Sequence, residues 1–217
     1  MAQYEQNLPQ KVEDSRHSPP TDPERRALGT GPIPHLSAED IGRLEIAAHD
    51  LSRKHGGEYG LFIRTTFDTA LRVNEVLTLR PMDIDLDNGP LVRVRREKGG
   101  HPPHCAISPT VATQLLSFAY QKGLANDSRF FTFNDRYAHR IVSRAAVAAG
   151  IKKPDGVGWV HLLRHSGAIE RLRVTRHPPG VQAQLGHRSP FMTYRYWRTL
   201  QAEEALETSQ LGVDLAR

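Results

Sequence analysis

The sequence has little cysteine and no long apolar runs. A single cysteine, Cys105, occurs among 217 residues, which excludes an intramolecular disulfide framework and fits a reducing cytoplasm. No apolar run reaches the roughly 18 residues that a membrane-spanning helix needs. The first residues, MAQYEQNLPQKVED, lack the apolar core of a secretory signal. We therefore expect a cytoplasmic protein with no membrane partner, built as one compact domain with extensions.

Positive charge is concentrated in the second half of the chain. Residues 91–198 hold 18 Lys and Arg against 5 Asp and Glu, a net charge of +13, whereas residues 1–90 carry −5 and residues 199–217 carry −3. Arg outnumbers Lys by 23 to 6, and only Arg offers a planar fork for phosphate oxygens. Any basic protein has basic faces, but a block of this size indicates a polyanionic partner, most simply DNA or RNA.

The first part of the chain has the pattern of a tail followed by helices. Residues 1–35 hold six prolines, charges of both signs and few large apolar residues, so we expect a disordered tail. Ser37-Ala38-Glu39-Asp40 resembles a capping box and starts a helix that Gly56-Gly57 ends. Further helices are predicted over residues 59–71 and 72–79.

After Pro81 the spacing of apolar residues changes to that of a β-sheet. Residues 82–86 and 91–95 flank a turn signal at 87–90, and residues 104–107 can return as a third strand. The two prolines just before this third strand confine it to an edge. The pattern therefore predicts a small three-stranded antiparallel sheet.

The predicted sheet carries cations on one face and at a hairpin tip. Arg93 and Arg95 alternate with valines in the second strand, so one face is apolar and the other cationic. Arg96 follows directly, and Lys98 lies in the turn Glu-Lys-Gly-Gly that leads to the third strand. We take the three arginines as candidate DNA contacts.

Helical patterns return for the rest of the chain. Helices are predicted over residues 108–122, 136–149, from 161 onward and over 199–212, the last acidic on one side. Arg136, Arg140 and Arg144 recur at every fourth position of the second of these. They would form a basic stripe suited to a DNA backbone, although a solvated helix face is the alternative.

The residues that can carry chemistry gather between positions 161 and 196. His161, Arg164 and His165 share a face at the start of a helix, and His187 and Tyr196 follow. Arg binds phosphate oxygens bidentately, His moves protons near neutral pH, and Tyr can act as a covalent nucleophile. Together these groups suit work on a phosphodiester.

A zinc site is the alternative for the histidine pair. The spacing of His161 and His165 allows both to ligate one metal ion, but Leu162 stands where the zinc-protease helix motif has its Glu. The basic block of residues 91–198 favours the phosphodiester interpretation.

Six positions along the chain occur in the order and spacing of one enzyme family. Residues 66–79, TFDTALRVNEVLTL, resemble the first arginine box of the tyrosine recombinases, the phage-integrase family. The arginine of this box is Arg72. Lys98, 26 residues after Arg72, resembles the family's β-hairpin lysine. Residues 161–166, HLLRHS, resemble its H-x-L-R-H-S box, residues 185–187 its LGH box, and Tyr196 stands at the nucleophile's position. The resemblance covers about residues 36–200.

The resemblance implies covalent catalysis on DNA. Arg72 and Arg164 would clamp the non-bridging oxygens of the scissile phosphate and stabilise the pentavalent transition state. Tyr196 would attack phosphorus and form a 3′-phosphotyrosyl bond. One phosphoester replaces another, so the family mechanism implies no cofactor, neither ATP nor a metal ion.

The same resemblance gives the remaining residues supporting roles. His161 would accept the proton of the tyrosine, Lys98 would protonate the leaving 5′ oxygen, and His187 would donate a hydrogen bond to the phosphate. Glu75 would orient Arg72, and His165 would help to position the reacting groups without contacting the substrate.

A second tyrosine competes for the role of nucleophile. Tyr194 and Tyr196 are two residues apart, and on a helix such positions differ by about 200° in direction, so only one of them can face the site. The nine-residue spacing from His187 favours Tyr196, and Tyr194 then becomes a packing residue.

Two features depart from the family pattern. The hairpin return His-Pro-Pro-His at residues 101–104 replaces a stretch that is usually basic. Most members also carry a separate helical domain before the catalytic one, where this sequence has only residues 1–35. Fimbrial phase-switch invertases have similarly short N-termini.

We therefore expect an α+β fold, mainly helical with a small three-stranded antiparallel sheet. Residues 36–198 would form a tyrosine recombinase catalytic domain, and residues 199–217 a C-terminal helix able to dock in trans. The expected partners are double-stranded DNA, further copies of the chain (dimer to tetramer) on that DNA, and an accessory protein. The alternatives are a nicking-closing enzyme like the type IB topoisomerases and a DNA-binding regulator that has lost turnover.

Overall fold

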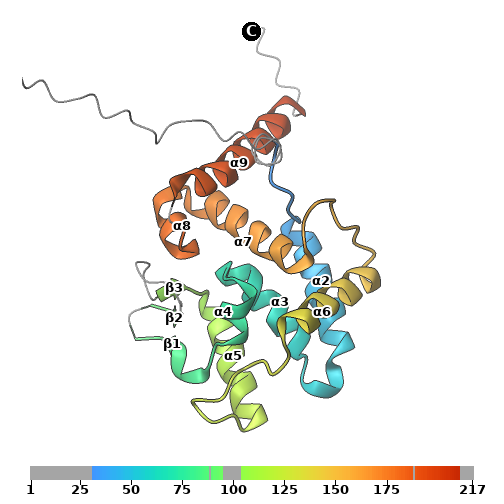
Figure 1. Ribbon diagram of the computed structural model, residues 1–217, viewed down its shortest axis with the longest axis vertical. Coiled ribbons are helices and arrows are strands. Elements are labelled where there is room, and N and C mark those ends of the chain that lie inside the picture. Colours follow the sequence, from blue (N-terminus) through green and yellow to red (C-terminus); the bar gives the residue numbers. More distant parts are fainter. Residues whose placement is uncertain (1–30, 88, 95–103, 188, 211–217) are drawn as a thin grey trace, which may run out of the picture. The chain divides into compact units, whose positions relative to one another are not determined.

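Helices dominate the part of the chain that the structure describes, which is residues 31–87, 89–94, 104–187 and 189–210 of a computed structural model (Figure 1). The predictions made for residues 1–30 and for Arg95, Arg96 and Lys98 lie outside these ranges. The helices are α2 (Ala38–Leu51), α3 (Glu58–Thr69), α4 (Val73–Leu77), α5 (Pro109–Lys122), α6 (Asp135–Ala148), α7 (Trp159–Thr175), α8 (Pro178–Leu185) and α9 (Pro190–Gln210), with 3-10 turns at Arg53–His55 and Pro81–Asp83. The strands are β1 (Ile84–Asp85), β2 (Leu91–Arg93) and β3 (His104–Ala106).

Helix α2 begins where its sequence signal predicted. The Ser37 side chain accepts a hydrogen bond from the Asp40 backbone N–H at 3.1 Å, which satisfies one of the free donors of the first turn. Ile41, Leu44 and Ala48 then bury one face of the helix. None of the helices in the described part of the chain is long and apolar enough to cross a membrane.

The sheet has the predicted three antiparallel strands in the order β1-β2-β3. Val92 and Val94 are buried while Arg93 is exposed, so the predicted alternation is confirmed. The strands are shorter than the predicted 82–86, 91–95 and 104–107. The prediction for the first strand was wrong at its start, because Pro81–Asp83 forms a 3-10 turn in which the Asp83 carboxylate accepts the Arg80 N–H at 3.0 Å.

Helix α9 is longer than predicted. It begins at Pro190, nine residues before the predicted start at residue 199. The reason lies in its buried face: Thr193, Tyr196 and Leu200 recur at i, i+3 and i+7 and are all buried. The nucleophile candidate is therefore a residue of this helix and not of a loop that precedes it.

The buried apolar residues that the structure describes form two clusters, and the smaller one holds α7, α8 and α9 together. It is formed by Ile33, Ala70, Ala168, Ile169, Leu172, Val181, Leu185, Tyr196 and Leu200, with Trp197 packed against it. Ile33 is buried in this cluster. One large apolar side chain of the stretch predicted as a tail, residues 1–35, is thus part of a core.

Helices α3 and α7 approach each other closely at Gly167. A Cβ atom at this position would overlap the carbonyl oxygen of Phe67. Only glycine allows this approach, and it brings the first two turns of α7 against the segment that follows α3.

Candidate active site

Arg164 is buried and joins three segments of the chain. Its Nη1 donates a hydrogen bond to the carbonyl of Ala70 at 2.6 Å, and its Nη2 donates to the carbonyl of Leu185 at 3.0 Å. Ala70 has a φ of 51°, in the left-handed region, which turns the chain between α3 and α4. The guanidinium is thereby fixed between the ends of α3 and α8.

Arg72 is held by Glu75 but reaches solvent. The Glu75 carboxylate accepts the backbone N–H of Arg72 at 2.9 Å and its Nη1 at 3.2 Å, which caps α4. The Arg72 side chain is 54% exposed, whereas that of Glu75 is 9% exposed. The contact that an orienting role for Glu75 requires is therefore present, and the role itself stays a prediction.

His187 connects Arg164 to the helix that carries Tyr196. Its Nε2 lies 3.3 Å from Nη2 of Arg164, and its Nδ1 lies 3.0 Å from the hydroxyl of Thr193. A guanidinium can only donate, so Nε2 is the acceptor and Nδ1 carries the proton of the neutral ring. The ring stacks on Tyr196, with centroids 5.9 Å apart and planes inclined by 8°.

Sequence reasoning missed Thr193. This residue is buried and fixes the orientation of His187 through its hydroxyl. The signal that could have found it is its position one helical turn before Tyr196, on the same face of α9.

The two tyrosines of α9 have opposite environments. Tyr196 is 1% exposed and Tyr194 is 56% exposed, so the two point in different directions, as predicted. Burial raises the pKa of Tyr196 above its ordinary value of 10.0, although Arg164 and Arg195 act in the opposite direction. The ring of His165 meets that of Tyr196 edge-on, with centroids 5.7 Å apart.

The histidines of the first two turns of α7 differ in burial. His161 is exposed. Burial lowers the pKa of His165 to about 4, a hydrogen bond to the Pro34 carbonyl opposes this, and His161, Arg164 and Arg195 lower the pKa further. His165 is therefore neutral at pH 7. Within the described ranges, no third His, Cys, Asp or Glu joins the two in an arrangement that could hold a metal ion.

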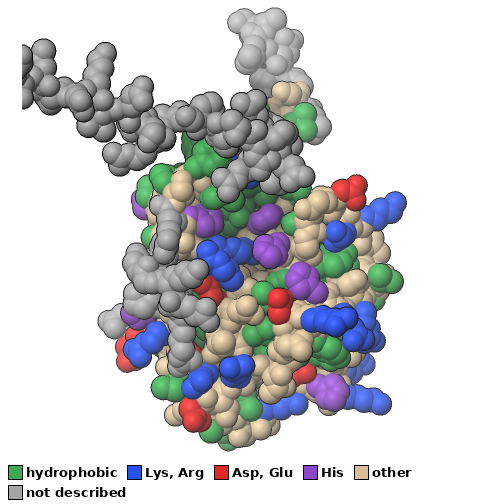
Figure 2. Space-filling model, in the orientation of Figure 1, with side chains coloured by type: hydrophobic (Ala, Val, Ile, Leu, Met, Phe, Trp, Pro, Cys, Tyr) green, Lys and Arg blue, Asp and Glu red, His purple; other side chains and the backbone are tan. Residues whose placement is uncertain are grey.

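The candidate DNA contacts that the structure describes are exposed. Arg136, Arg140 and Arg144 lie along the outer side of α6, and Arg93 lies on β2. Figure 2 shows Lys and Arg side chains gathered where α6 lies, with His side chains across the middle of the same face. His139 of α6 and His161 of α7 approach each other at Gly158, because ring atoms of both lie within 4 Å of the place that a Cβ would occupy at this residue.

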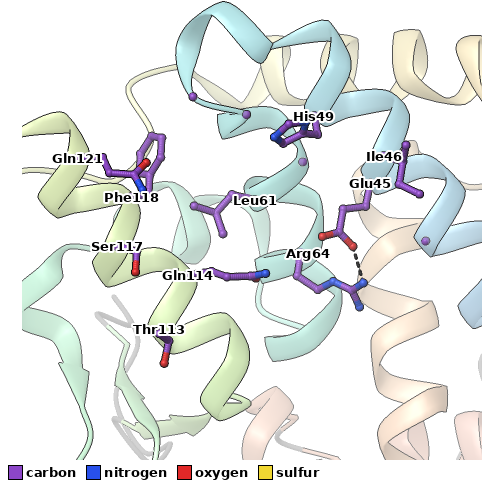
Figure 3. Close-up of a pocket in the computed structure, with 14 residues that line it drawn as sticks. Glu45, Ile46, His49, Leu61, Arg64, Thr113, Gln114, Ser117, Phe118 and Gln121 are labelled. Atoms are coloured by element: carbon purple, nitrogen blue, oxygen red, sulfur yellow. Dashed lines mark ion pairs between the residues drawn. The ribbon is translucent and has the colours of Figure 1, made fainter.

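A surface pocket of about 620 Å³ lies elsewhere, between α2, α3 and α5 (Figure 3). Glu45 and Arg64 form an ion pair in it, and His49 and Phe118 contribute to its wall. None of the sequence-predicted site residues lines this pocket, so it is separate from the arrangement around Tyr196.

Comparisons with known proteins give matches to one family. The model of the phage integrase family matches residues 35–203. Tyrosine recombinase XerA of Saccharolobus solfataricus is 33% identical over 137 residues, which are 63% of this chain and 44% of the relative. A probable integrase/recombinase protein of Methanocaldococcus jannaschii is 30% identical over 159 residues, 68% of this chain and 47% of the relative. The chain thus spans about half the length of these curated relatives.

Solved structures share the fold. The catalytic domain of bacteriophage HP1 integrase superposes with a TM-score of 0.59 at 25% identity, covering 85% of this chain and 98% of that one. The crystal structure of XerA recombinase superposes with a TM-score of 0.63 at 23% identity, covering 82% of this chain and 66% of that one. XerH recombinase bound to its difH substrate superposes with a TM-score of 0.62 at 21% identity, covering 80% of this chain and 53% of that one. The predicted α+β fold, mainly helical with a small antiparallel sheet, is confirmed.

Proposed function

The chain belongs to the phage integrase family, and we propose that it is a site-specific recombinase that cleaves and rejoins DNA strands through Tyr196. The observation that carries this proposal is the contact series from Arg164 through His187 to the ring of Tyr196. A buried cation, an oriented imidazole and a phenol stand in direct succession. Such a set can bind a phosphate and attack it.

The proposed cleavage step exchanges one phosphoester for another. The Tyr196 oxygen forms a bond to phosphorus, and the bond between phosphorus and the 5′ oxygen breaks. The tyrosine proton passes to His161, and the 5′ oxygen takes a proton from Lys98. Arg72 and Arg164 hold the non-bridging oxygens while negative charge accumulates on them. The reverse sequence rejoins the strands, so neither step consumes ATP or needs a metal ion.

Two features of the free protein bear on this step. The pKa of Tyr196 is raised by burial, so the attack depends on a proton acceptor and on the arginines. The ring is also 1% exposed, so the phosphate reaches its oxygen only after a local movement of α9 or of the segments around it. DNA binding supplies the energy for that movement in the proposed mechanism.

The proposed partner is double-stranded DNA. Exposed arginines on α6 and β2 support phosphate contacts, which position a protein but carry little sequence information. Binding should therefore weaken steeply with salt. Recombination joins two sites, and one structural relative is a lambda integrase tetramer bound to a Holliday junction. We propose a dimer that assembles into a tetramer on DNA, with an accessory protein as a further partner.

A nicked suicide duplex tests the proposal. Cleavage next to a nick releases a short 5′ fragment, which traps the covalent intermediate. A covalent adduct between protein and the 3′ phosphate is the expected result, followed by strand exchange when two sites are present. Absence of any adduct would indicate a DNA-binding regulator that has lost turnover. Adduct without strand exchange would instead indicate a nicking-closing enzyme.

A further inference from the structure

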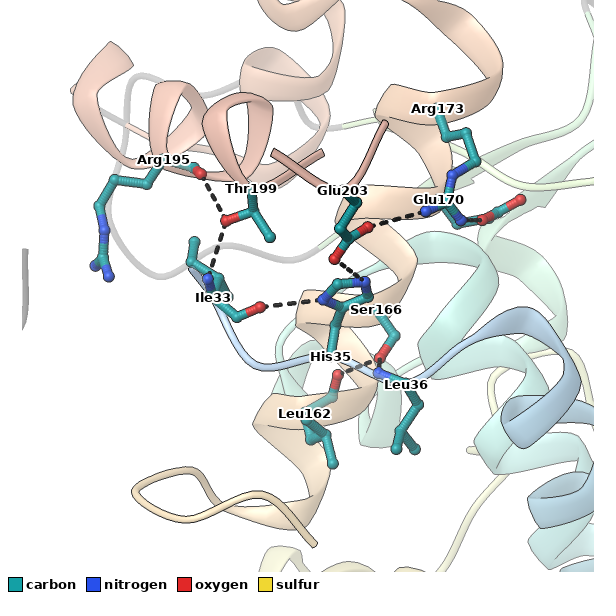
Figure 4. A network of polar contacts seen from close by, with 10 residues as sticks. All are labelled: Ile33, His35, Leu36, Leu162, Ser166, Glu170, Arg173, Arg195, Thr199 and Glu203. Atoms are coloured by element: carbon teal, nitrogen blue, oxygen red, sulfur yellow. Dashed lines mark hydrogen bonds and ion pairs between the residues drawn. The ribbon is translucent and has the colours of Figure 1, made fainter. Parts of the chain in front are cut away.

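Residues Ile33–Leu36, which we call the N-terminal strap, bind both α7 and α9 (Figure 4). The backbone N–H of Ile33 donates to the Thr199 hydroxyl of α9 at 2.9 Å. The backbone N–H of Leu36 donates to the Ser166 hydroxyl of α7 at 2.8 Å. Both hydrogen bonds are buried, where leaving a backbone donor unpaired is costly. The strap therefore fixes the two helices to one short piece of chain.

The two hydroxyls stand next to the candidate site. Thr199 lies one turn after Tyr196 on α9, and Ser166 directly follows His165 on α7. Each hydroxyl also donates to its own helix, Thr199 to the carbonyl of Arg195 at 3.0 Å and Ser166 to that of Leu162 at 2.8 Å. Their rotation is thereby fixed, so the strap meets acceptors of defined direction.

Glu203 of α9 adds a charged contact to both the strap and α7. One carboxylate oxygen lies 3.0 Å from Nε2 of His35, and the other lies 3.1 Å from Nη2 of Arg173. Arg173 is itself paired with Glu170 at 2.9 Å. The second ring nitrogen of His35 lies 3.1 Å from the Ile33 carbonyl. Each ring nitrogen of His35 thus faces an oxygen that can only accept a hydrogen bond.

We propose that His35 and Glu203 are positioning residues: with the strap, they hold α9 on the α7 of the same chain and so determine where Tyr196 lies. The His35 side chain is 16% exposed and that of Glu203 is 31% exposed, so their contact is better shielded from water than an ordinary surface pair. The part of this inference that concerns DNA cleavage rests on the proposed function. The structural part concerns the free protein.

The chain offers a matched control. Arg176 of the α7 C-terminus and Glu204 of α9 form an ion pair at 2.6 Å that does not include the strap. Glu204→Gln therefore removes one charged contact between the same two segments, as Glu203→Gln does. Of the three variants, only Glu203→Gln and His35→Gln also remove a contact of the strap.

Hydrogen–deuterium exchange of the full chain without DNA tests the structural part. We expect Glu203→Gln and His35→Gln to speed amide exchange in α9 by about threefold to tenfold, with α2 to α6 unchanged. Glu204→Gln should have a smaller effect. Equal exchange in wild type and both strap variants would overturn the proposal, as would an equal effect of Glu204→Gln.

Single-turnover cleavage of the suicide duplex at saturating DNA tests the effect on Tyr196. The two strap variants should form adduct more slowly by a similar factor while their Kd for DNA stays unchanged, and Glu204→Gln should behave like wild type. Faster amide exchange in α9 with an unchanged cleavage rate, or a loss confined to DNA affinity, would contradict the positioning role. If wild type itself forms no adduct, the proposed function fails, and the exchange experiment still decides whether the strap holds α9.

Discussion

His187 and Tyr196 stack almost face to face, with ring planes 8° apart and centroids 5.9 Å apart. The same imidazole contacts Arg164 through Nε2 and Thr193 through Nδ1. A single ring therefore connects the buried arginine at the start of α7 with two residues of α9. Any change in the position of α9 alters the surroundings of Arg164 as well, so under the proposed mechanism the binding of phosphate and the placement of Tyr196 are coupled.

The first prediction separates the two tyrosines. Tyr196→Phe should abolish covalent adduct while the Kd for DNA stays within a few-fold, because only one buried hydroxyl is lost. Tyr194→Phe is the matched control and should form adduct at the wild-type rate, since Tyr194 is 56% exposed. Denaturing gel electrophoresis after incubation with the suicide duplex measures both. Adduct from the Tyr196 variant and none from the Tyr194 variant would reverse the assignment.

The second prediction concerns Lys98 as the proton donor. Lys98→Ala should slow cleavage of ordinary DNA but should cleave a substrate with a 5′-bridging phosphorothiolate at nearly the wild-type rate. A thiolate leaves without a proton, so the general acid is no longer needed. Comparing single-turnover rates on the two substrates measures the effect. A defect of equal size on both would mean that Lys98 serves only to bind DNA.

The third prediction concerns the contact between α3 and α7. Gly167→Ala should lower the free energy of unfolding by about 1–3 kcal/mol, because its Cβ would overlap the Phe67 carbonyl and separate the helices. Gly42→Ala in α2 is the control, since a Cβ there meets nothing within 4 Å. It should be neutral or stabilise by up to about 1 kcal/mol. Urea unfolding of both variants measures these changes. An unchanged unfolding midpoint for Gly167→Ala would refute the close approach of the two helices.

The fourth prediction follows from the buried imidazole of His165. Its pKa is about 4 in the folded protein, against an ordinary value of 6.5, so between these values the unfolded chain binds a proton that the folded chain excludes. Stability from this group is fully present above pH 6.5 and is lost as the pH falls towards 4, by at most about 1.4 kcal/mol per pH unit.

The measurement is the difference in unfolding free energy between wild type and His165→Asn at several pH values. The difference should be constant above pH 6.5. Below pH 6.5 the unfolding free energy of wild type should fall relative to that of His165→Asn. Taking the difference removes the contributions of the other histidines. A flat difference down to pH 4 would show that His165 accepts a proton in the folded protein.

The helices were predictable because their signals are local. The catalytic candidates also rest on local signals, and their roles stay predictions. A capping residue, a repeated apolar position or a short box can be read from neighbouring residues, and the predicted membership of the tyrosine recombinase family is confirmed by the match over residues 35–203. The contacts that organise the site are not local. Ile33 meets Thr199 and Leu36 meets Ser166 across 166 and 130 positions of the chain, and no spacing rule relates them.

The start of α9 and the burial of Tyr196 could not be predicted for a related reason. Periodicity suggests that positions 193, 196 and 200 share a face, but whether that face is buried depends on α7 and α8. The same holds for Arg164, which as a charged residue would be expected at the surface. It is buried because the carbonyls of Ala70 and Leu185 accept its hydrogen bonds, and those acceptors appear only once the chain has folded.

Trp197 packs against the apolar cluster that contains Tyr196, and this gives the proposed nucleophile helix an intrinsic fluorescent reporter. The chain has two tryptophans, and the other, Trp159, is the first residue of α7. In a Trp159→Phe variant all indole emission comes from α9. Separation of this helix from α7 would expose the indole to water and shift its emission to longer wavelength. Stopped-flow mixing with DNA could then time the movement of α9 against the appearance of adduct, without any attached dye.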